Sequence, residues 1–189
     1  ARLTNTASKF GVEFDSLADV VAFGVAPAFL LYFYIGIDYG RLGTSIPALF
    51  VIFGAVRLAR FNITSISEPN FFIGLPIPSA AVIVMLWILV DLKYDFIKTY
   101  HYEYLMLGGS FIVSILMVSN IRYPSFKKIQ WNFKSFIAVI LLLGIIYISP
   151  QETLCVLMSS YVIYGIVRWI IIVIKMRFHT KSNQRSNGA

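Results

Sequence analysis

The sequence has little charge for its length. Of its 189 residues, 13% are charged, whereas 58% are hydrophobic and the mean hydropathy is +0.77. A soluble domain needs about a quarter of its residues charged to cover its surface. The composition therefore excludes a soluble globular domain and predicts an integral membrane protein.

Cysteine and histidine are also scarce. Cys155 is the single cysteine, so no disulfide can form within the chain, and its apolar surroundings predict a small buried side chain. We expect His101 on the outer side of the membrane and His179 in the C-terminal tail, where neither suits the chemistry inferred below. No signal-peptide pattern and no internal repeat is present.

Long apolar runs, in contrast, are abundant. A helix that crosses a bilayer needs about 20 mostly apolar residues. The sequence therefore predicts an all-α, polytopic membrane bundle with about six transmembrane helices, two of them short for a full crossing. We expect residues 1–174 to form the membrane-embedded domain and the basic and polar residues 175–189 to form a fraying cytoplasmic tail. The six segments are 20–39, 44–61, 76–92, 104–121, 135–149 and 153–174.

The basic residues predict the orientation of these helices. If the N-terminus is cytoplasmic, twelve of the sixteen lysines and arginines lie inside, three lie outside, and Arg168 lies within the last helix. Such an excess of Lys and Arg is typical of cytoplasmic loops, which accounts for the net charge of +7 without nucleic acid. The acidic stretch GVEFDSLAD (11–19) then faces the cytoplasm.

This stretch places three acids at the start of an apolar segment. If residues 11–37 form one helix, Gly11, Asp15 and Asp19 stack on one face, while Glu13 points elsewhere. Carboxylates on successive turns repel each other unless a cation lies between them, and hard ions such as Mg²⁺ or Mn²⁺ prefer oxygen ligands. The alternative is that the acids merely solvate and cap a helix start. Spacing alone indicates no more than a cation site.

A longer pattern contains these residues. Ala1-Arg2, eight residues, Gly11, three residues, Asp15, three residues and Asp19 resemble the second half of the signature D-x-x-D-G-x-x-A-R-x8-G-x3-D-x3-D. This is the signature of the CDP-alcohol phosphatidyltransferase family. The first half should lie just before Ala1, so we expect further N-terminal helices upstream and an inactive protein without them. Four stretches resemble the integral-membrane members that use serine as acceptor: LTNTASKFGVEFDSLAD (3–19), RLARFN (57–62), FFIGLPIPSAA (71–81) and MVSNIRYPSFK (117–127).

The resemblance implies a reaction and a site. It implies that the serine hydroxyl attacks the β-phosphorus of CDP-diacylglycerol at a bacterial inner membrane, giving phosphatidylserine and CMP. Asp15 and Asp19 would bind metal, which in the family is a pair of Mg²⁺ or Mn²⁺ ions. Asp19 would also be the general base. Membrane lipid and a second copy of the chain in a homodimer are the implied partners. The remaining expected residues are Gly11, Arg2 and Thr6 for the nucleotide, and Arg57, Arg60, Asn62 and Arg122 for the headgroup.

Other interpretations stay open. Arg57 and Arg60 are also expected at the end of a membrane helix for purely topological reasons, because arginine reaches to the interface. The signature allows another acceptor alcohol, such as glycerol 3-phosphate or inositol phosphate. A small ion or proton transporter would need acids deep within several helices. The segments VIVMLWILV, MLGGSFIVSILMV and AVILLLGII contain none, which disfavours transport.

Overall fold

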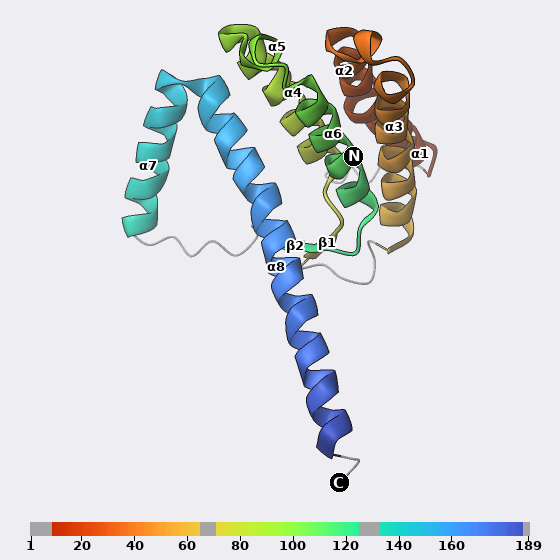
Figure 1. The fold of residues 1–189 in the computed structure, drawn as a ribbon. Helices are drawn as coiled ribbons and strands as arrows, with labels where there is room; N and C mark the ends of the chain where they lie inside the picture. The colour runs from red at the N-terminus through yellow and green to blue at the C-terminus, as the bar shows by residue number, and fades with distance from the viewer. Residues whose placement is uncertain (1–8, 65–70, 125–132, 187–189) are drawn as a thin grey trace.

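The computed structural model describes residues 9–64, 71–124 and 133–186. Nearly all of these residues are helical, which confirms the predicted all-α class, and a two-stranded ribbon is the one addition (Figure 1). The elements in chain order are α1 (Lys9–Val20), the π-helical turn η1 (Val21–Val25), α2 (Ala26–Tyr34), the 3₁₀ turn η2 (Gly36–Tyr39), α3 (Gly40–Thr64), β1 (Phe71–Ile73), α4 (Ile77–Tyr94), α5 (Phe96–Thr99), α6 (Glu103–Val118), β2 (Arg122–Pro124), α7 (Phe133–Ile148) and α8 (Pro150–Ser186).

Six apolar helices correspond to the six predicted segments. Four of them are long and apolar enough to cross a membrane. The other two are shorter, and two short segments were predicted. Many large apolar side chains on their outer faces are exposed, which is normal for surfaces that contact lipid. The four long helices are Glu13–Tyr34, Gly36–Ile63, Ile77–Tyr94 and Pro150–Ile171, and the two shorter ones are Glu103–Val118 and Val139–Ile148.

The first long helix departs from the predicted 11–37 in two ways. It ends at Tyr34, and a π-helical turn at Val21–Val25 interrupts it. Pro27 explains the turn, because it has no N–H to donate and its ring crowds the carbonyl four residues earlier. The N–H of Ala26 accordingly donates to the carbonyl of Val21, five residues back. The turn lies directly after the acidic stretch.

Helix α4 lies at the centre of the core. Ala80, Ile83 and Val84 are almost completely buried, and α4 packs against α2, α6 and α8. In the neighbouring α6, the buried hydroxyls of Ser110 and Ser114 donate to carbonyls one turn earlier, so neither is left unsatisfied. The core therefore fixes α2, α4 and α6 relative to one another.

The end of the bundle away from α1 is closed by polar contacts. The Tyr34 hydroxyl donates to Asp91 Oδ2 at 2.6 Å, and the backbone N–H of Ile97 donates to Asp91 Oδ1. Lys93 forms an ion pair with Glu152. The buried acid Asp91 is therefore satisfied, and it joins α2 to α4.

The C-terminal hairpin is more peripheral. Helix α7 packs against α8, which packs against α4, and Figure 1 shows α7 standing apart from α1–α6. Two expectations were wrong here. Cys155 is only half-buried, because it lies on this peripheral helix. Helix α8 continues to Ser186 instead of fraying after residue 174, since residues 175–186 contain no proline or glycine to stop it. The division at residue 174 into a domain and a cytoplasmic tail stays a prediction.

Candidate functional site

The acidic residues lie on α1, as the sequence predicts. Gly11, Asp15 and Asp19 belong to one uninterrupted α-helix, so their spacing places them on one face. The side chain of Asp15 is exposed and that of Asp19 is half-buried, because α3 packs against α1 near Asp19. Glu13 is exposed and belongs to a different face. Two carboxylates one turn apart can contribute oxygen ligands to one hard cation.

Arg57, on α3, is the unusual residue beside them. It is only 6% exposed, and its guanidinium lies 5.1 Å from the ring centroid of Phe61. The carboxylate of Asp19 lies close enough to interact with it electrostatically. Arg57 Nε is nevertheless buried without a hydrogen-bond partner among the described residues. A buried charged donor without a hydrogen bond is costly, so Arg57 Nε is a candidate contact for an anion.

Arg60 has a different environment. One of its terminal nitrogens donates to Asn120 Oδ1 at 2.6 Å, and the other donates to the carbonyl of Val118 at 3.3 Å. These bonds fasten the end of α3 to the end of α6. Arg60 therefore bonds to the protein through its terminal nitrogens, whereas the recorded neighbours of Arg57 are the Phe61 ring and Asp19.

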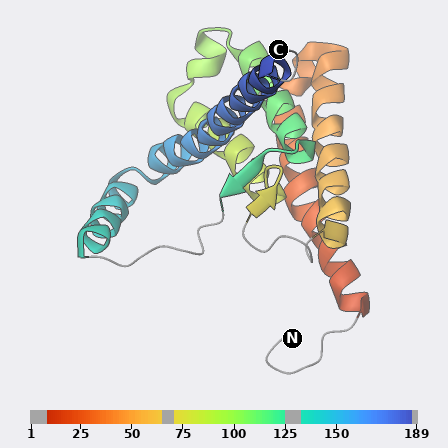
Figure 2. The same cartoon turned by 90° about the horizontal axis from the view of Figure 1, so that it is seen from below.

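Asn62 fastens α3 to α1. Its side-chain amide donates to Ser16 Oγ at 2.9 Å, and Ser16 lies between the two acidic positions of α1. In Figure 2, α1 and the last turns of α3 lie side by side, as this contact requires. Sequence reasoning missed Ser16, because a contact across 46 residues leaves no local spacing signal.

The segment GLPIP forms the floor of this end of the bundle. The N–H of Gly74 donates to the carbonyl of Ile121 at 2.8 Å, and the N–H of Leu75 donates to that of Leu116 at 3.0 Å. Gly74 has φ +77°, and a Cβ there would lie 2.4 Å from the Met117 carbonyl oxygen, so only glycine fits. Helix α4 then begins at Ile77, one residue after the start of the predicted segment 76–92.

The ribbon β1–β2 lies next to this floor. Its strands are antiparallel, and Ile73 pairs with Arg122. The backbone of Arg122 is therefore at the same end of the bundle as Gly74 and Asn120, although its side chain is outside the described part of the structure. Arg2 and Thr6, expected to contact the nucleotide, also lie outside the described residues.

The described residues fit a metal only in part. They contain no group of three or more Asp, Glu, His or Cys side chains that could hold an ion. Asp15 and Asp19 have the oxygen chemistry that Mg²⁺ or Mn²⁺ prefers, but such ions take about six ligands. These two residues are therefore suitable as part of a metal site, whose other ligands must come from elsewhere.

Comparison with known proteins shows what this chain is similar to. The family model for CDP-alcohol phosphatidyltransferase matches residues 1–119, which include the acidic stretch and RLARFN and exclude α7 and α8. A CDP-diacylglycerol–serine O-phosphatidyltransferase of Helicobacter pylori (strain J99) is 58% identical over 180 residues, covering 95% of this chain and 76% of the relative. One from Methanocaldococcus jannaschii is 39% identical over 171 residues, covering 90% of this chain and 75% of the relative.

A third relative differs in its name. The archaetidylserine synthase of Methanothermobacter thermautotrophicus is 40% identical over 118 residues, which cover 61% of this chain and 45% of that protein. The family match spans more than half of the chain, and the two longer relatives are at least 39% identical to it over 90% or more of its length. The chain belongs to the CDP-alcohol phosphatidyltransferase family.

Proposed function

We propose that this protein transfers the phosphatidyl group of CDP-diacylglycerol to L-serine, giving phosphatidylserine and CMP. The buried Nε of Arg57, which has no hydrogen-bond partner among the described residues and lies beside Asp19, carries the proposal, because an anion at the acidic end of α1 would accept its hydrogen bond. Both substrates present one: serine has a carboxylate and CDP-diacylglycerol a diphosphate. The names of the relatives from Helicobacter pylori and Methanocaldococcus jannaschii support serine as the acceptor.

In the proposed mechanism Asp19 is the general base. It accepts the proton of the serine hydroxyl while the serine oxygen forms a bond to the β-phosphorus. The bond between that phosphorus and the bridging oxygen breaks, and CMP leaves with the bond's electron pair. A base must be within hydrogen-bond reach of the hydroxyl, and Asp19 is one turn beyond Asp15 on the same helix face. Asn62 and Ser16 hold this helix against α3.

The family is generally dependent on a divalent metal ion. We propose that Asp15 and Asp19 contribute ligands to two ions, Mg²⁺ or Mn²⁺. Bound metal would neutralise charge on the diphosphate and on the leaving CMP. Gly11 lies one turn before Asp15, where the absence of a side chain lets a nucleotide approach the helix. Arg2 and Thr6 remain proposed nucleotide contacts.

The acceptor headgroup would lie between α3 and the ribbon. Arg57 is the proposed partner of the serine carboxylate, because guanidinium and carboxylate match as a bidentate pair. Arg60, Asn62 and Arg122 remain proposed contacts around it. Arg60 already bonds to Asn120, and Asn62 already bonds to Ser16. Both residues would therefore hold the helices around the headgroup in place as well as contact it.

We propose a bacterial inner-membrane location with the site facing the cytoplasm, and a homodimer. The orientation can be tested with single cysteines in a Cys155→Ser background. Phe10→Cys lies at the site end and Thr99→Cys at the other, and both positions are exposed. A membrane-impermeant maleimide added to intact cells should label Thr99→Cys and spare Phe10→Cys. The reverse pattern would refute the orientation. Cross-linking in membranes would test the dimer.

The reaction is tested by acceptor choice. The purified full-length protein is given CDP-diacylglycerol with serine, glycerol 3-phosphate or inositol phosphate, and CMP release is measured. We expect CMP release only when serine is the acceptor. Asp19→Asn should lower turnover by about 10²–10⁴-fold, the usual contribution of a general base, while the fold is kept. Glu13→Gln, on another face of α1, is the matched control. Release that depends on glycerol 3-phosphate, or a near-normal Asp19→Asn, would refute the proposal.

A further inference from the structure

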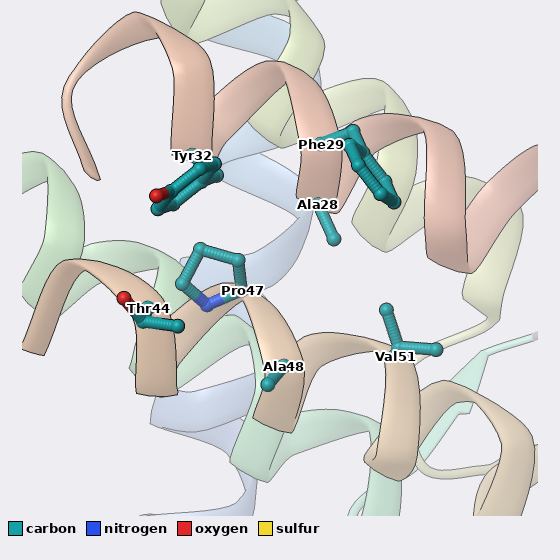
Figure 3. A pocket seen from close by; sticks show the side chains of 7 residues that line it. All are labelled: Ala28, Phe29, Tyr32, Thr44, Pro47, Ala48 and Val51. Atoms are coloured by element: carbon teal, nitrogen blue, oxygen red, sulfur yellow. The ribbon is translucent and has the colours of Figure 1, made fainter. Parts of the chain in front are cut away.

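The π-helical turn η1 lies between two helical segments that both pack against α3. Before the turn, Ser16 Oγ of α1 accepts a hydrogen bond from Asn62, and Asp19 lies beside Arg57. After the turn, Ala28 of α2 is buried and points toward α3, as Figure 3 shows. Each segment therefore has an inward face, and the two inward faces contact the same helix.

The turn between these faces is also packed. Gly24 is buried, and a Cβ there would lie 3.8 Å from Ile77 Cδ1 of α4 and 3.9 Å from Val51 Cα of α3. Ala22, in contrast, is exposed. Because the turn and α2 are held by two helices of the core, the number of residues in the turn decides which face α1 presents to α3.

The helical period shows what the turn does to Asp19. The buried side chains of α2, which are Pro27, Ala28 and Leu31, define the inward direction. A continuous α-helix extended back from them would place Asp19 about 130° from that direction, on the outer side. A turn closed by a bond to the fifth residue back contains one extra residue, which changes the direction by about 100°. With the turn, Asp19 lies about 30° from the inward direction.

The exposure of α1 agrees with the register that includes the turn. Ser16 and Asp19 are half-buried, whereas Leu17 is 66% exposed. In a continuous α-helix, Leu17 would lie about 35° from the inward direction and Ser16 about 65°. The extra residue therefore turns the acidic face of α1 toward α3, where a continuous helix would turn it toward the surroundings of the bundle.

Pro27 makes this turn less costly. A continuous α-helix would need the N–H of residue 27 to donate to the carbonyl of Phe23, and proline has no N–H. A proline does not impose such a turn alone, because Pro47 lies within α3, which is α-helical from Gly40 to Thr64. At Pro27 the packing on both sides also requires the extra residue, and the proline removes the bond that would favour a continuous α-helix.

We infer that Pro27 is a positioning residue, which acts through the π-helical turn to make Asp19 face Arg57. The inference rests on the proposed function for the role of Asp19, whereas the direction in which α1 faces can be measured separately. Pro27 contacts no reacting atom. Its effect on the reaction is large because a misplacement of about 1 Å can lower a rate about 10²-fold.

Cross-linking measures which face of α1 meets α3, without requiring turnover. The full-length protein, with all other cysteines replaced by serine, carries Asn62→Cys together with Ser16→Cys or Leu17→Cys. The probe is dibromobimane, a short cross-linker that becomes fluorescent when it joins two thiols. We expect fluorescence with Ser16→Cys and none with Leu17→Cys. After Pro27→Ala, the signal with Ser16→Cys should fall and a signal with Leu17→Cys should appear, because a continuous α-helix turns that face inward.

Changing the number of residues in the turn separates position from general damage. Pro27→Ala alone should lower kcat for CMP release with serine about 10²-fold. Deleting the exposed Ala22 in addition leaves a continuous α-helix without the extra residue, so the original face of α1 meets α3 and both kcat and the Ser16→Cys signal should be restored. Inserting one alanine after Ala22 in the parent turns α1 by a further 100°, about the angle of one residue, and should abolish both. Pro47→Ala is the matched control and should change neither.

Each opposite result overturns the inference. Equal losses on deletion and insertion would show that the turn does not set the direction of α1, and an unchanged Ser16→Cys signal after Pro27→Ala would show that the proline is not responsible. Cross-links that follow the prediction in a parent without serine-dependent CMP release refute the proposed reaction alone. Normal CMP release in a variant whose cross-link has moved to Leu17→Cys refutes the positioning role alone.

Discussion

Replacing Arg57 separates binding of an anion from support of the fold. The substitution Arg57→Met keeps a long side chain and removes the charge, including the buried Nε that has no partner among the described residues. A buried donor left unsatisfied costs about 1–3 kcal/mol, and this cost is relieved when the donor is removed. Asp19, the acid beside Arg57, is only half-buried, so water can solvate its carboxylate once the guanidinium is gone. If Arg57 is retained for a ligand, the variant should be at least as stable as the parent while it loses activity.

The loss of activity can be estimated. A hydrogen bond to a charged group contributes about 1.5–3 kcal/mol, which corresponds to a loss of about 10- to 150-fold in binding. We expect this loss in the KM for serine, with a smaller change in the KM for CDP-diacylglycerol. Arg57→Lys keeps the charge but loses the planar fork, so it should recover only part of the affinity. The Phe61 ring under the guanidinium is kept in both variants.

Two measurements decide the outcome. The first is CMP release at varied serine and varied CDP-diacylglycerol, and the second is the temperature at which half of the detergent-solubilised protein loses its monodisperse peak. Arg60→Met is the matched control three residues later, because Arg60 bonds to Asn120 and to the carbonyl of Val118. It should lower the stability. If Arg57→Met lowers stability and activity together, as Arg60→Met is expected to do, Arg57 supports the fold and the reasoning is refuted.

Three further predictions concern the frame of the site and its metal. Gly74→Ala should destabilise the protein by about 1–3 kcal/mol, measured by the same thermal assay, because φ is positive and the new Cβ would meet the Met117 carbonyl; an unchanged midpoint would contradict this. Asn62→Ala should lower the free energy of unfolding by about 0.5–1.5 kcal/mol, because its bond to Ser16 is lost, and should lower kcat. Asn62→Gln keeps the amide but shifts its position, so we expect it to lower both values too, and unchanged values would contradict a role for the bond to Ser16. Chelation with EDTA should abolish CMP release and added Mg²⁺ or Mn²⁺ should restore it, whereas full activity after chelation would exclude a metal-dependent reaction.

The sequence predicted the helices well because their signal is local. Apolar runs of sufficient length define membrane helices without reference to the rest of the chain, and six were found in the expected places. The shared face of Gly11, Asp15 and Asp19 follows from the helical period alone. Errors occurred where a chemical detail changes the helix, as at Pro27, whose missing N–H produces the π-helical turn.

Contacts between distant segments could not be predicted. RLARFN identifies two arginines at one helix end, but it contains nothing that distinguishes the environment of Arg57 from that of Arg60. The difference arises from Asn120, which lies 60 residues later and bonds to Arg60. The bond between Asn62 and Ser16 is equally remote in sequence. Both contacts depend on how α1, α3 and α6 pack, and packing partners are not encoded in the period of any one helix.

The arrangement explains why polar chemistry can take place on a protein with so little charge. The backbone contacts of Gly74 and the side-chain bonds of Arg60 and Asn62 tie α1, α3, α4 and α6 together at one end, using few charged groups. The buried charge of Arg57 is tolerated there because neighbouring bonds keep the helix ends in place. A site held this way can leave one donor unpaired for substrate, whereas a looser end would let Arg57 turn toward water and pair with it. Rigidity at the helix ends and the unsatisfied Nε are therefore the two features on which the proposed binding of an anionic substrate depends.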